Sequence, residues 1–63
     1  MSPDPVRLLT IPEVAERLAL SRRKVEQLIH DGELRSVHFG RSVRVTETAL
    51  GHLVAAREHR RVA

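Results

Sequence analysis

The residues best equipped for chemistry in this 63-residue chain stand close together, at Arg22, Arg23, Lys24, Glu26 and Gln27. An arginine guanidinium can form paired hydrogen bonds with guanine or phosphate, and a glutamine amide can pair with an adenine edge in a DNA major groove. The three cations crowd the expected start of a helix, where the helix dipole favours anions instead. The stretch therefore suits contact with an anionic partner, although a merely solvated basic face would have the same composition.

The positive charge of the chain is concentrated around that stretch. Between Ser21 and Val45 there are six cations and three anions, a balance of +3 that equals the formal net charge of the whole chain. The cations are Arg22, Arg23, Lys24, Arg35, Arg41 and Arg44, and the anions are Glu26, Asp31 and Glu33. Charge gathered on the elements that a groove-binding domain would present is a more specific sign of DNA binding than a basic total.

Catalysis and metal binding have weaker support in the sequence. None of the four histidines belongs to an H-x-x-x-H or H-E-x-x-H motif, and the chain has no cysteine. The serines lack the motifs that surround a nucleophile, and a chain this short has little room for a substrate pocket. We therefore expect a protein that is not an enzyme and that has no catalytic residue, no metal site and no cofactor.

Capping signals predict the helix that carries the basic stretch. A helix over 21–31 is expected, because Ser21 can cap its start and Gly32 can end it in the left-handed conformation that glycine adopts easily. One face of this helix is apolar and must be buried. Its residues are Val25, Leu28 and Ile29.

A second helix is predicted just before it, from Thr10 to about Ala19. Thr10 and Glu13 have the spacing of a capping box, and Pro12 fits the first turn. The two helices are separated by so few residues that they must cross steeply, as in a helix-turn-helix motif. The expected buried face of this helix consists of Ile11, Val14, Ala15 and Leu18.

After Gly32 the pattern changes to that of a β-hairpin. Strands are expected over 34–39 and 42–45, around a tight turn at Gly40 and Arg41, where glycine supplies the positive φ that hairpin turns need. A two-stranded ribbon is unstable alone, so it must lean on the helices, in the manner of a wing. The apolar faces of the two strands would consist of Val37 and Phe39, and of Val43 and Val45.

The rest of the chain completes a mainly α domain with a small hairpin. Thr46 is expected to cap a third helix, and a short extended piece over 6–9 to precede the first. The predicted organisation is a flexible lead-in over 1–7, a winged helix-turn-helix domain over 8–56 with three helices and a two-stranded wing, and a polar basic tail over 57–63. The buried stripe of the third helix would be Ala49, Leu50, Leu53 and Val54.

The sequence offers no sign of membrane insertion or export. No apolar run approaches the roughly 20 residues that cross a bilayer. The first five residues lack the charged start and apolar centre of a signal peptide. We therefore expect a cytoplasmic protein of a bacterial host, associated with DNA and not with membranes.

Five short motifs, taken in order, resemble the excisionase-like family of small winged-helix proteins, relatives of the DNA-binding domain of MerR regulators. The resemblance covers about residues 8–54. The family often has an aromatic residue near positions 27 and 28, where this chain has Gln27 and Leu28. The motifs are Leu9-Thr10-x-x-Glu13-Val14-Ala15-x-x-Leu18, Leu20-Ser21-x-x-x-Val25, Gly32-Glu33-Leu34, Phe39-Gly40-Arg41-x-x-Arg44-Val45 and Ala49-Leu50.

The resemblance implies how the domain meets double-stranded DNA. The helix over 21–31 would enter the major groove, and the wing over 40–42 would lie against the adjacent minor groove. Arg41 would enter that narrow groove, where the negative potential attracts arginine, and Arg44 would have a structural or phosphate-binding role. Thr10 and Ser21 would offer backbone N–H groups to phosphates. The contacts to bases or flanking phosphates would come from Arg22, Arg23, Glu26 and Gln27, with Lys24 on a phosphate.

The resemblance also narrows the function. The residues after Leu53 are too few for the long coiled coil through which MerR regulators dimerise. We expect a phage or mobile-element excisionase, an architectural protein that binds repeated sites cooperatively, bends DNA and directs an integrase towards excision. Its partners would be DNA, further copies of itself and the integrase, with 53–61 as the surface for proteins. A small winged-helix transcriptional regulator is the first alternative, and a protein-interaction module such as an antitoxin or adaptor is the second.

Overall fold

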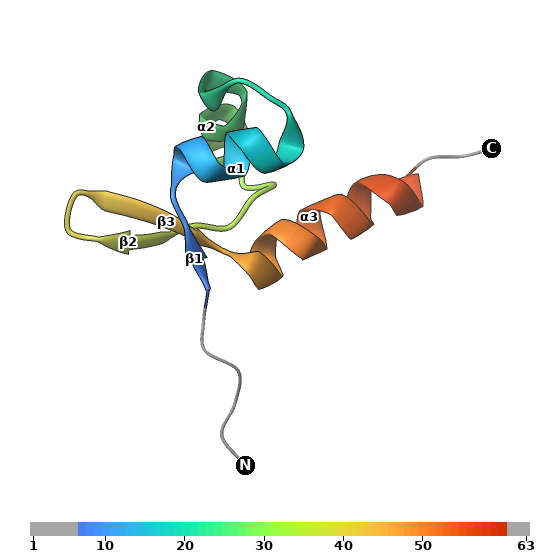
Figure 1. The fold of residues 1–63 in the computed structure, drawn as a ribbon. Coiled ribbons are helices and arrows are strands. Elements are labelled where there is room, and N and C mark those ends of the chain that lie inside the picture. The colour runs from blue at the N-terminus through green and yellow to red at the C-terminus, as the bar shows by residue number, and fades with distance from the viewer. Residues whose placement is uncertain (1–6, 61–63) are drawn as a thin grey trace, which may run out of the picture.

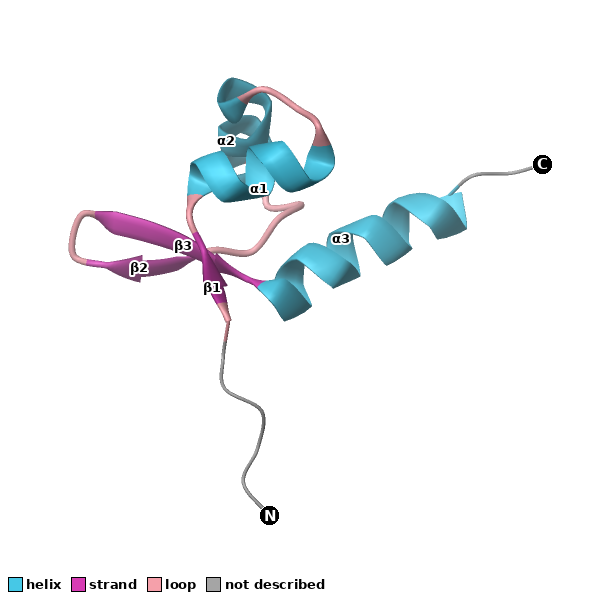
Figure 2. Ribbon diagram, viewed as in Figure 1, coloured by secondary structure: helices cyan, strands magenta, loops and turns pink. Residues whose placement is uncertain are grey.

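The computed structural model describes residues 7–60, in which a small sheet is combined with three helices (Figures 1 and 2). In Figure 1, α1 and α2 lie together on one side of the sheet, the β2–β3 hairpin projects to the left, and α3 extends to the right. The predicted mainly α, winged helix-turn-helix fold is confirmed. The elements are β1 (Leu8–Leu9), α1 (Ile11–Leu18), α2 (Arg22–His30), β2 (Val37–Phe39), β3 (Ser42–Thr46) and α3 (Glu47–Arg60).

Helix α1 begins with the predicted capping box. The Thr10 hydroxyl accepts a hydrogen bond from the Glu13 backbone N–H at 3.3 Å, and the Glu13 carboxylate accepts one from the Thr10 backbone N–H at 2.8 Å. The helix ends at Ala19, which is left-handed with φ of 57°. The following N–H, that of Leu20, donates to the carbonyl of Ala15. The turn between the helices therefore closes without glycine, at a cost of about 1–2 kcal/mol for the left-handed alanine.

Helix α2 starts after a three-residue turn and is capped at both ends as predicted. The Ser21 hydroxyl accepts a hydrogen bond from the Lys24 N–H at 3.1 Å. At the other end, Gly32 is left-handed with φ of 81°. The N–H groups of Glu33 and Leu34 both donate to the Leu28 carbonyl, at 3.0 and 3.1 Å. The chain beyond Gly32 thus stays bound to the end of α2.

Because residues 33 and 34 are bonded to the end of α2, the first strand of the hairpin is shorter than predicted. The turn at Gly40 and Arg41 is confirmed, with φ of 62° at the glycine. The predicted start of the first strand at residue 34 is wrong, because β2 contains only residues 37–39. Leu34 is instead 1% exposed, and its backbone closes α2. A third strand, β1, was not predicted as part of the sheet, and its two residues pair with the end of β3 in the order β1-β3-β2.

The register of the sheet decides which side chains reach the helices. Residues paired across antiparallel strands point to the same face, and side chains alternate along each strand. Leu9 and Val45 are paired and buried on the face towards the core. Leu8, Val37 and Phe39 occupy the opposite face and are 41%, 37% and 56% exposed. The hairpin therefore leans on the helices through β3, and the apolar face of β2 is turned away.

The core joins α1 and α2 to the first half of α3. Thr46 caps α3 as predicted, with its hydroxyl accepting a hydrogen bond from the Ala49 N–H at 3.0 Å. The predicted burial of Val54 is wrong, since it is 41% exposed, and α3 continues to Arg60. Within residues 7–60, none of the helices combines the length and hydropathy needed to cross a bilayer. The buried apolar residues are Leu9, Val14, Ala15, Val25, Leu28, Leu34, Val45, Leu50 and Leu53.

Candidate nucleic-acid interface

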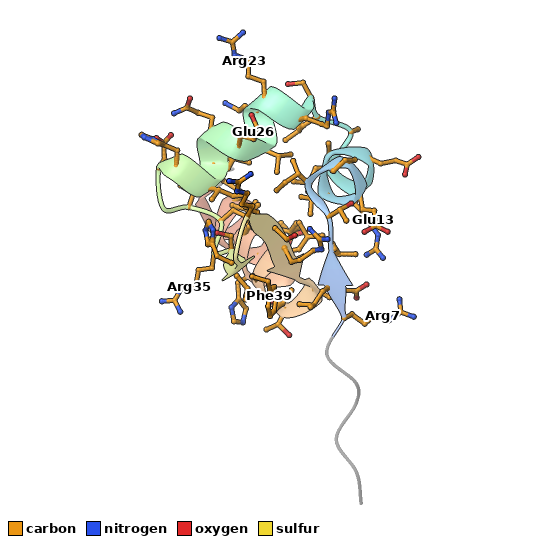
Figure 3. All side chains as sticks on the ribbon, turned by 90° about the vertical axis from the view of Figure 1, so that its left-hand side faces the viewer. Arg7, Glu13, Arg23, Glu26, Arg35 and Phe39 are labelled. Atoms are coloured by element: carbon orange, nitrogen blue, oxygen red, sulfur yellow. The ribbon has the colours of Figure 1, made fainter. Side chains whose placement is uncertain are left out.

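The first turn of α2 carries cations where helices usually place acidic residues. Arg22, Arg23 and Lys24 are all exposed, and this turn contains no acidic residue. Ser21 satisfies the N–H of Lys24, whereas the N–H groups of Arg22 and Arg23 have no partner among the described residues. Figure 3 shows Arg23 projecting outward from the end of the helix. Free N–H groups, the helix dipole and the added cations together make this end attractive to anions.

The start of α1 is closed in comparison. The N–H of Thr10 already donates to the Glu13 carboxylate, so a phosphate would have to displace that carboxylate to reach it. This hydrogen bond is the main reason that the pKa of Glu13 lies below its ordinary value. The Thr10 hydroxyl and the charges of Arg17 and Arg44 lower the pKa further. The N-terminus of α1 is therefore already occupied by the Glu13 carboxylate of the same helix.

Three arginines outside α2 and the hairpin form ion pairs. Arg17 donates to the Glu47 carboxylate at 2.9 Å, and Arg7 lies 3.7 Å from the same oxygen. Arg57 donates to Glu33 at 2.5 Å. We call Arg7, Arg17 and Arg57 the paired arginines. Two carboxylates face these three arginines, because Arg7 and Arg17 share Glu47 and Arg57 has Glu33.

Five other exposed cations form no ion pair with any carboxylate of residues 7–58. They come from α2, from the segment that follows it and from the hairpin turn. In Figure 3, where the hairpin side of the molecule faces the viewer, Arg23 and Arg35 project outward from opposite ends of this face. Among the described residues, positive charge without a paired carboxylate therefore gathers on these elements. We call the five residues the unpaired cations: Arg22, Arg23, Lys24, Arg35 and Arg41.

The two arginines predicted to act from the hairpin are placed differently. Arg41 is exposed at the tip, directly after Gly40 in the two-residue turn. Arg44 is half-buried, and its guanidinium donates to the carbonyl of Val43 at 2.9 Å. Its charge also acts on Glu13 of α1. Of its two predicted roles, this position favours the structural one, whereas Arg41 is free to reach a groove.

The polar residues on the outer face of α2 include an internal contact. The Gln27 amide donates to the Asp31 carboxylate at 3.0 Å, and the Nδ1 atom of His30 lies 3.6 Å from the same carboxylate. Glu26 is exposed on the same helix and is labelled beside it in Figure 3. Gln27 is therefore held along the helix surface, and a contact with a base would replace its bond to Asp31.

Sequence reasoning counted the charge of Arg35 but did not include this residue among the predicted DNA contacts. The structure places it exposed in the connection between α2 and β2, one residue after the buried Leu34. Its place in the chain, on the short link between α2 and the hairpin, is the signal that groups it with the exposed cations of those two elements.

Comparison with known proteins agrees with this arrangement. A family model described as a helix-turn-helix domain matches residues 8–58, which include all five unpaired cations. A probable excisionase of Saccharopolyspora erythraea is 42% identical over 48 residues, covering 76% of this chain and 49% of the relative. Proposed DNA-binding proteins from two strains of Mycobacterium tuberculosis are each 46% identical over 44 residues, covering 70% of this chain and 56% of those relatives.

These relatives are longer than the chain described above. The chain spans about half the length of the curated relatives that it matches. No solved structure gave a significant match. The likeness therefore concerns the helix-turn-helix domain.

Proposed function

The chain belongs to the helix-turn-helix domain family of excisionase-like DNA-binding proteins, and we propose that it acts as the excisionase of a phage or other mobile element. It binds double-stranded DNA through the helix-turn-helix domain. In the proposed role it occupies repeated sites cooperatively, bends the DNA between them and directs an integrase towards excision. In this proposal, the residues that contact DNA are those of α2 and the hairpin.

The observation that carries the proposal is the gathering of the unpaired cations on α2, on the segment that follows it and on the hairpin turn. A major groove about 12 Å wide admits an α-helix. With α2 in that groove, Arg22, Arg23 and Gln27 meet base edges or flanking phosphates, and Lys24 meets a phosphate. The hairpin then lies at the adjacent minor groove, where Arg41 enters a strongly negative channel. Glu26, on the same helix, accepts a hydrogen bond from a cytosine amino group.

The Saccharopolyspora relative supports the choice of an excisionase over other DNA-binding roles. An architectural protein needs contacts in two neighbouring grooves, because a bend is maintained by the additional contacts that it permits. It also needs a surface for neighbouring proteins. The second half of α3 supplies one in this proposal, since Val54 is 41% exposed there and lines a groove with Leu20 and Leu53.

A promoter-binding regulator of the same fold is the second candidate. The mycobacterial relatives favour it, because their names describe DNA binding without excision. Both candidates use the same DNA face, so its geometry does not separate them. They differ in the number of copies that bind and in the distortion of the DNA.

The proposal is tested by gel-shift titration on three DNAs of equal length: the attachment region of the source element, the promoter nearest to its coding sequence and a scrambled control. A circular-permutation assay on the attachment DNA measures the bend. A ladder of cooperative complexes with a large bend on attachment DNA is the expected result. An integrase reaction with and without the protein then tests excision directly.

Two other outcomes would change the conclusion. One unbent complex, or binding at the promoter alone, would replace the excisionase with the regulator. Absence of a specific shift on either natural DNA would favour a protein-interaction module whose basic surface is only solvated. Arg17→Gln removes the charge of a paired arginine. It is the control that separates a general loss of positive charge from the loss of an unpaired cation.

A further inference from the structure

The only phenylalanine of the protein, which has no tyrosine or tryptophan, has no role in the core. Phe39 is 56% exposed, whereas the buried apolar residues are all aliphatic. Its partner across the hairpin is Ser42, and both residues lie on the sheet face opposite Val45. Burial of a phenylalanine contributes about 1.5–3 kcal/mol to stability, and this fold makes little use of it. The side chain is therefore available for a partner.

The position of Phe39 connects it with the proposed DNA surface. It is the last residue of β2, directly before the turn formed by Gly40 and Arg41. In Figure 3, Phe39 lies at the lower side of the hairpin, whereas Arg23 projects from α2 at the top. Val37 shares its sheet face but lies two residues further from the turn and is less exposed, at 37%. The exposed ring is thus at the end of the hairpin that approaches the minor groove.

We propose that Phe39 is an apolar wedge that partly unstacks a base step in the minor groove next to Arg41. This inference rests on the docking described under the proposed function and assigns to one residue the start of the bend. Side chains of this kind kink DNA in other minor-groove proteins by entering between bases, while arginine reads the groove width beside them. The step should be a pyrimidine–purine step, because such steps unstack at the lowest cost.

DNA is a better occupant for this ring than a protein, because the ring stands two residues from Arg41, an unpaired cation at the hairpin tip. Arg41 and Arg35 bracket β2 in sequence, and neither has a carboxylate partner among residues 7–58. A minor groove offers phosphate for the arginines and sugar and base surfaces for the ring. The open space around Gly40 allows the backbone to approach the groove closely.

The test compares Phe39→Ala and Phe39→Leu with the matched control Val37→Ala, which trims the same sheet face away from the tip. Affinity is measured by fluorescence anisotropy, the bend by energy transfer between end-labelled DNA termini, and unstacking by 2-aminopurine placed in turn at the steps beneath the hairpin. We expect Phe39→Ala to bind about tenfold more weakly, by analogy with loss of a base–aromatic contact. It should also lose most of the bend and of the 2-aminopurine signal.

Phe39→Leu should keep part of all three signals, and Val37→Ala should resemble the wild type. Equal bend and equal 2-aminopurine signal in Phe39→Ala and the wild type would overturn the wedge. Equal losses in Val37→Ala and Phe39→Ala would also overturn it, because the effect would then belong to the whole sheet face. A wild type that unstacks a step through Phe39 without bending the DNA would contradict the architectural function and leave the wedge standing. Absence of DNA binding by the wild type would overturn both.

Discussion

The two helices of the helix-turn-helix motif begin in opposite ways. At the start of α1, Thr10 and Glu13 satisfy each other's polar groups, and the carboxylate lies at the positive end of the helix dipole. At the start of α2, Ser21 supplies one cap, and Arg22 and Arg23 stand where the dipole disfavours them. Each misplaced cation costs roughly 0.3–1 kcal/mol of helix stability. The first helix end is stabilised internally, and the second is left open to an external anion.

The same contrast separates the paired arginines from the unpaired cations. Arg17 and Arg7 meet at Glu47, and Arg57 meets Glu33, so that these charges connect parts of the fold. The unpaired cations connect nothing within residues 7–58. Charges of one type therefore have two uses in this small domain, and the presence or absence of a paired carboxylate distinguishes these uses better than the number of charges does.

Charge reversal among the unpaired cations should have the largest effect on DNA affinity. We expect the double variant Arg23→Glu/Arg41→Glu to bind DNA at least about a hundredfold more weakly, since each change removes one phosphate or groove contact and adds repulsion. Arg23→Glu alone should raise the free energy of unfolding by about 0.3–1 kcal/mol, because an anion suits the start of α2. Anisotropy titration and thermal unfolding measure the two effects. Unchanged DNA affinity in the double variant would refute the groove-and-wing arrangement.

The salt dependence of binding provides a second measurement. If the five unpaired cations each release a counterion, log affinity should fall against log salt concentration with a slope of about −4 to −5. Arg41→Gln should make that slope shallower by about 1, whereas Arg17→Gln should leave it unchanged. A nearly flat dependence for the wild type would mean that few phosphates are contacted. Equal slopes for the two variants would remove the distinction between the two groups of cations.

Two glycines should respond to alanine in opposite directions. Gly51 lies in α3 with no atom within 4 Å of an added Cβ, so Gly51→Ala should stabilise the protein by up to about 1 kcal/mol. Gly40 has equal space but φ of 62°, so Gly40→Ala should destabilise the hairpin by about 1–2 kcal/mol. Thermal unfolding detects both, at about 4–8 °C per kcal/mol for a domain of this size. DNA affinity should fall only for Gly40→Ala, and a loss in Gly51→Ala would place α3 at the interface.

The smallest expected effect concerns pH and the start of α1. The pKa of Glu13 is lowered in the folded protein, so its contribution to stability is complete above its ordinary value of 4.5 and is lost as the pH falls through the lowered folded value. Wild-type stability should therefore decline in acid more steeply than that of Glu13→Gln. Urea unfolding between pH 6 and 3 measures this difference. Parallel pH profiles would show that the capping box does not depend on the charge.

Most short-range features of the fold were predictable from the sequence. The caps at Thr10, Ser21 and Thr46 each join residues three positions apart, and all three are present. The left-handed residues Gly32 and Gly40 were also predictable, because few other residues adopt positive φ at low cost. The DNA contacts themselves remain predictions, although the structure shows which of the expected side chains are exposed and unpaired.

Several features could not be read from local pattern. Strand β1 has only two residues, too few to show the alternation of a strand. Its pairing with β3 joins segments that are far apart in the sequence. Leu34 was expected to begin a strand because it is apolar. Its side chain is instead buried in the core, and its N–H is bonded to the end of α2. Val54 fitted the apolar stripe of α3, yet it is 41% exposed at the edge of an open groove, while the adjacent Leu53 is buried.

Where each helix begins and where the chain turns follow from the local sequence, because capping and positive φ are properties of residues within a few positions of one another. Which cations are paired with carboxylates depends on the fold. Arg17 and Glu47 are 30 positions apart, and Arg57 and Glu33 are 24 positions apart. A charge meets a partner at such a separation only after the chain has folded. The difference between a stabilising arginine and one available to DNA is therefore a property of the fold.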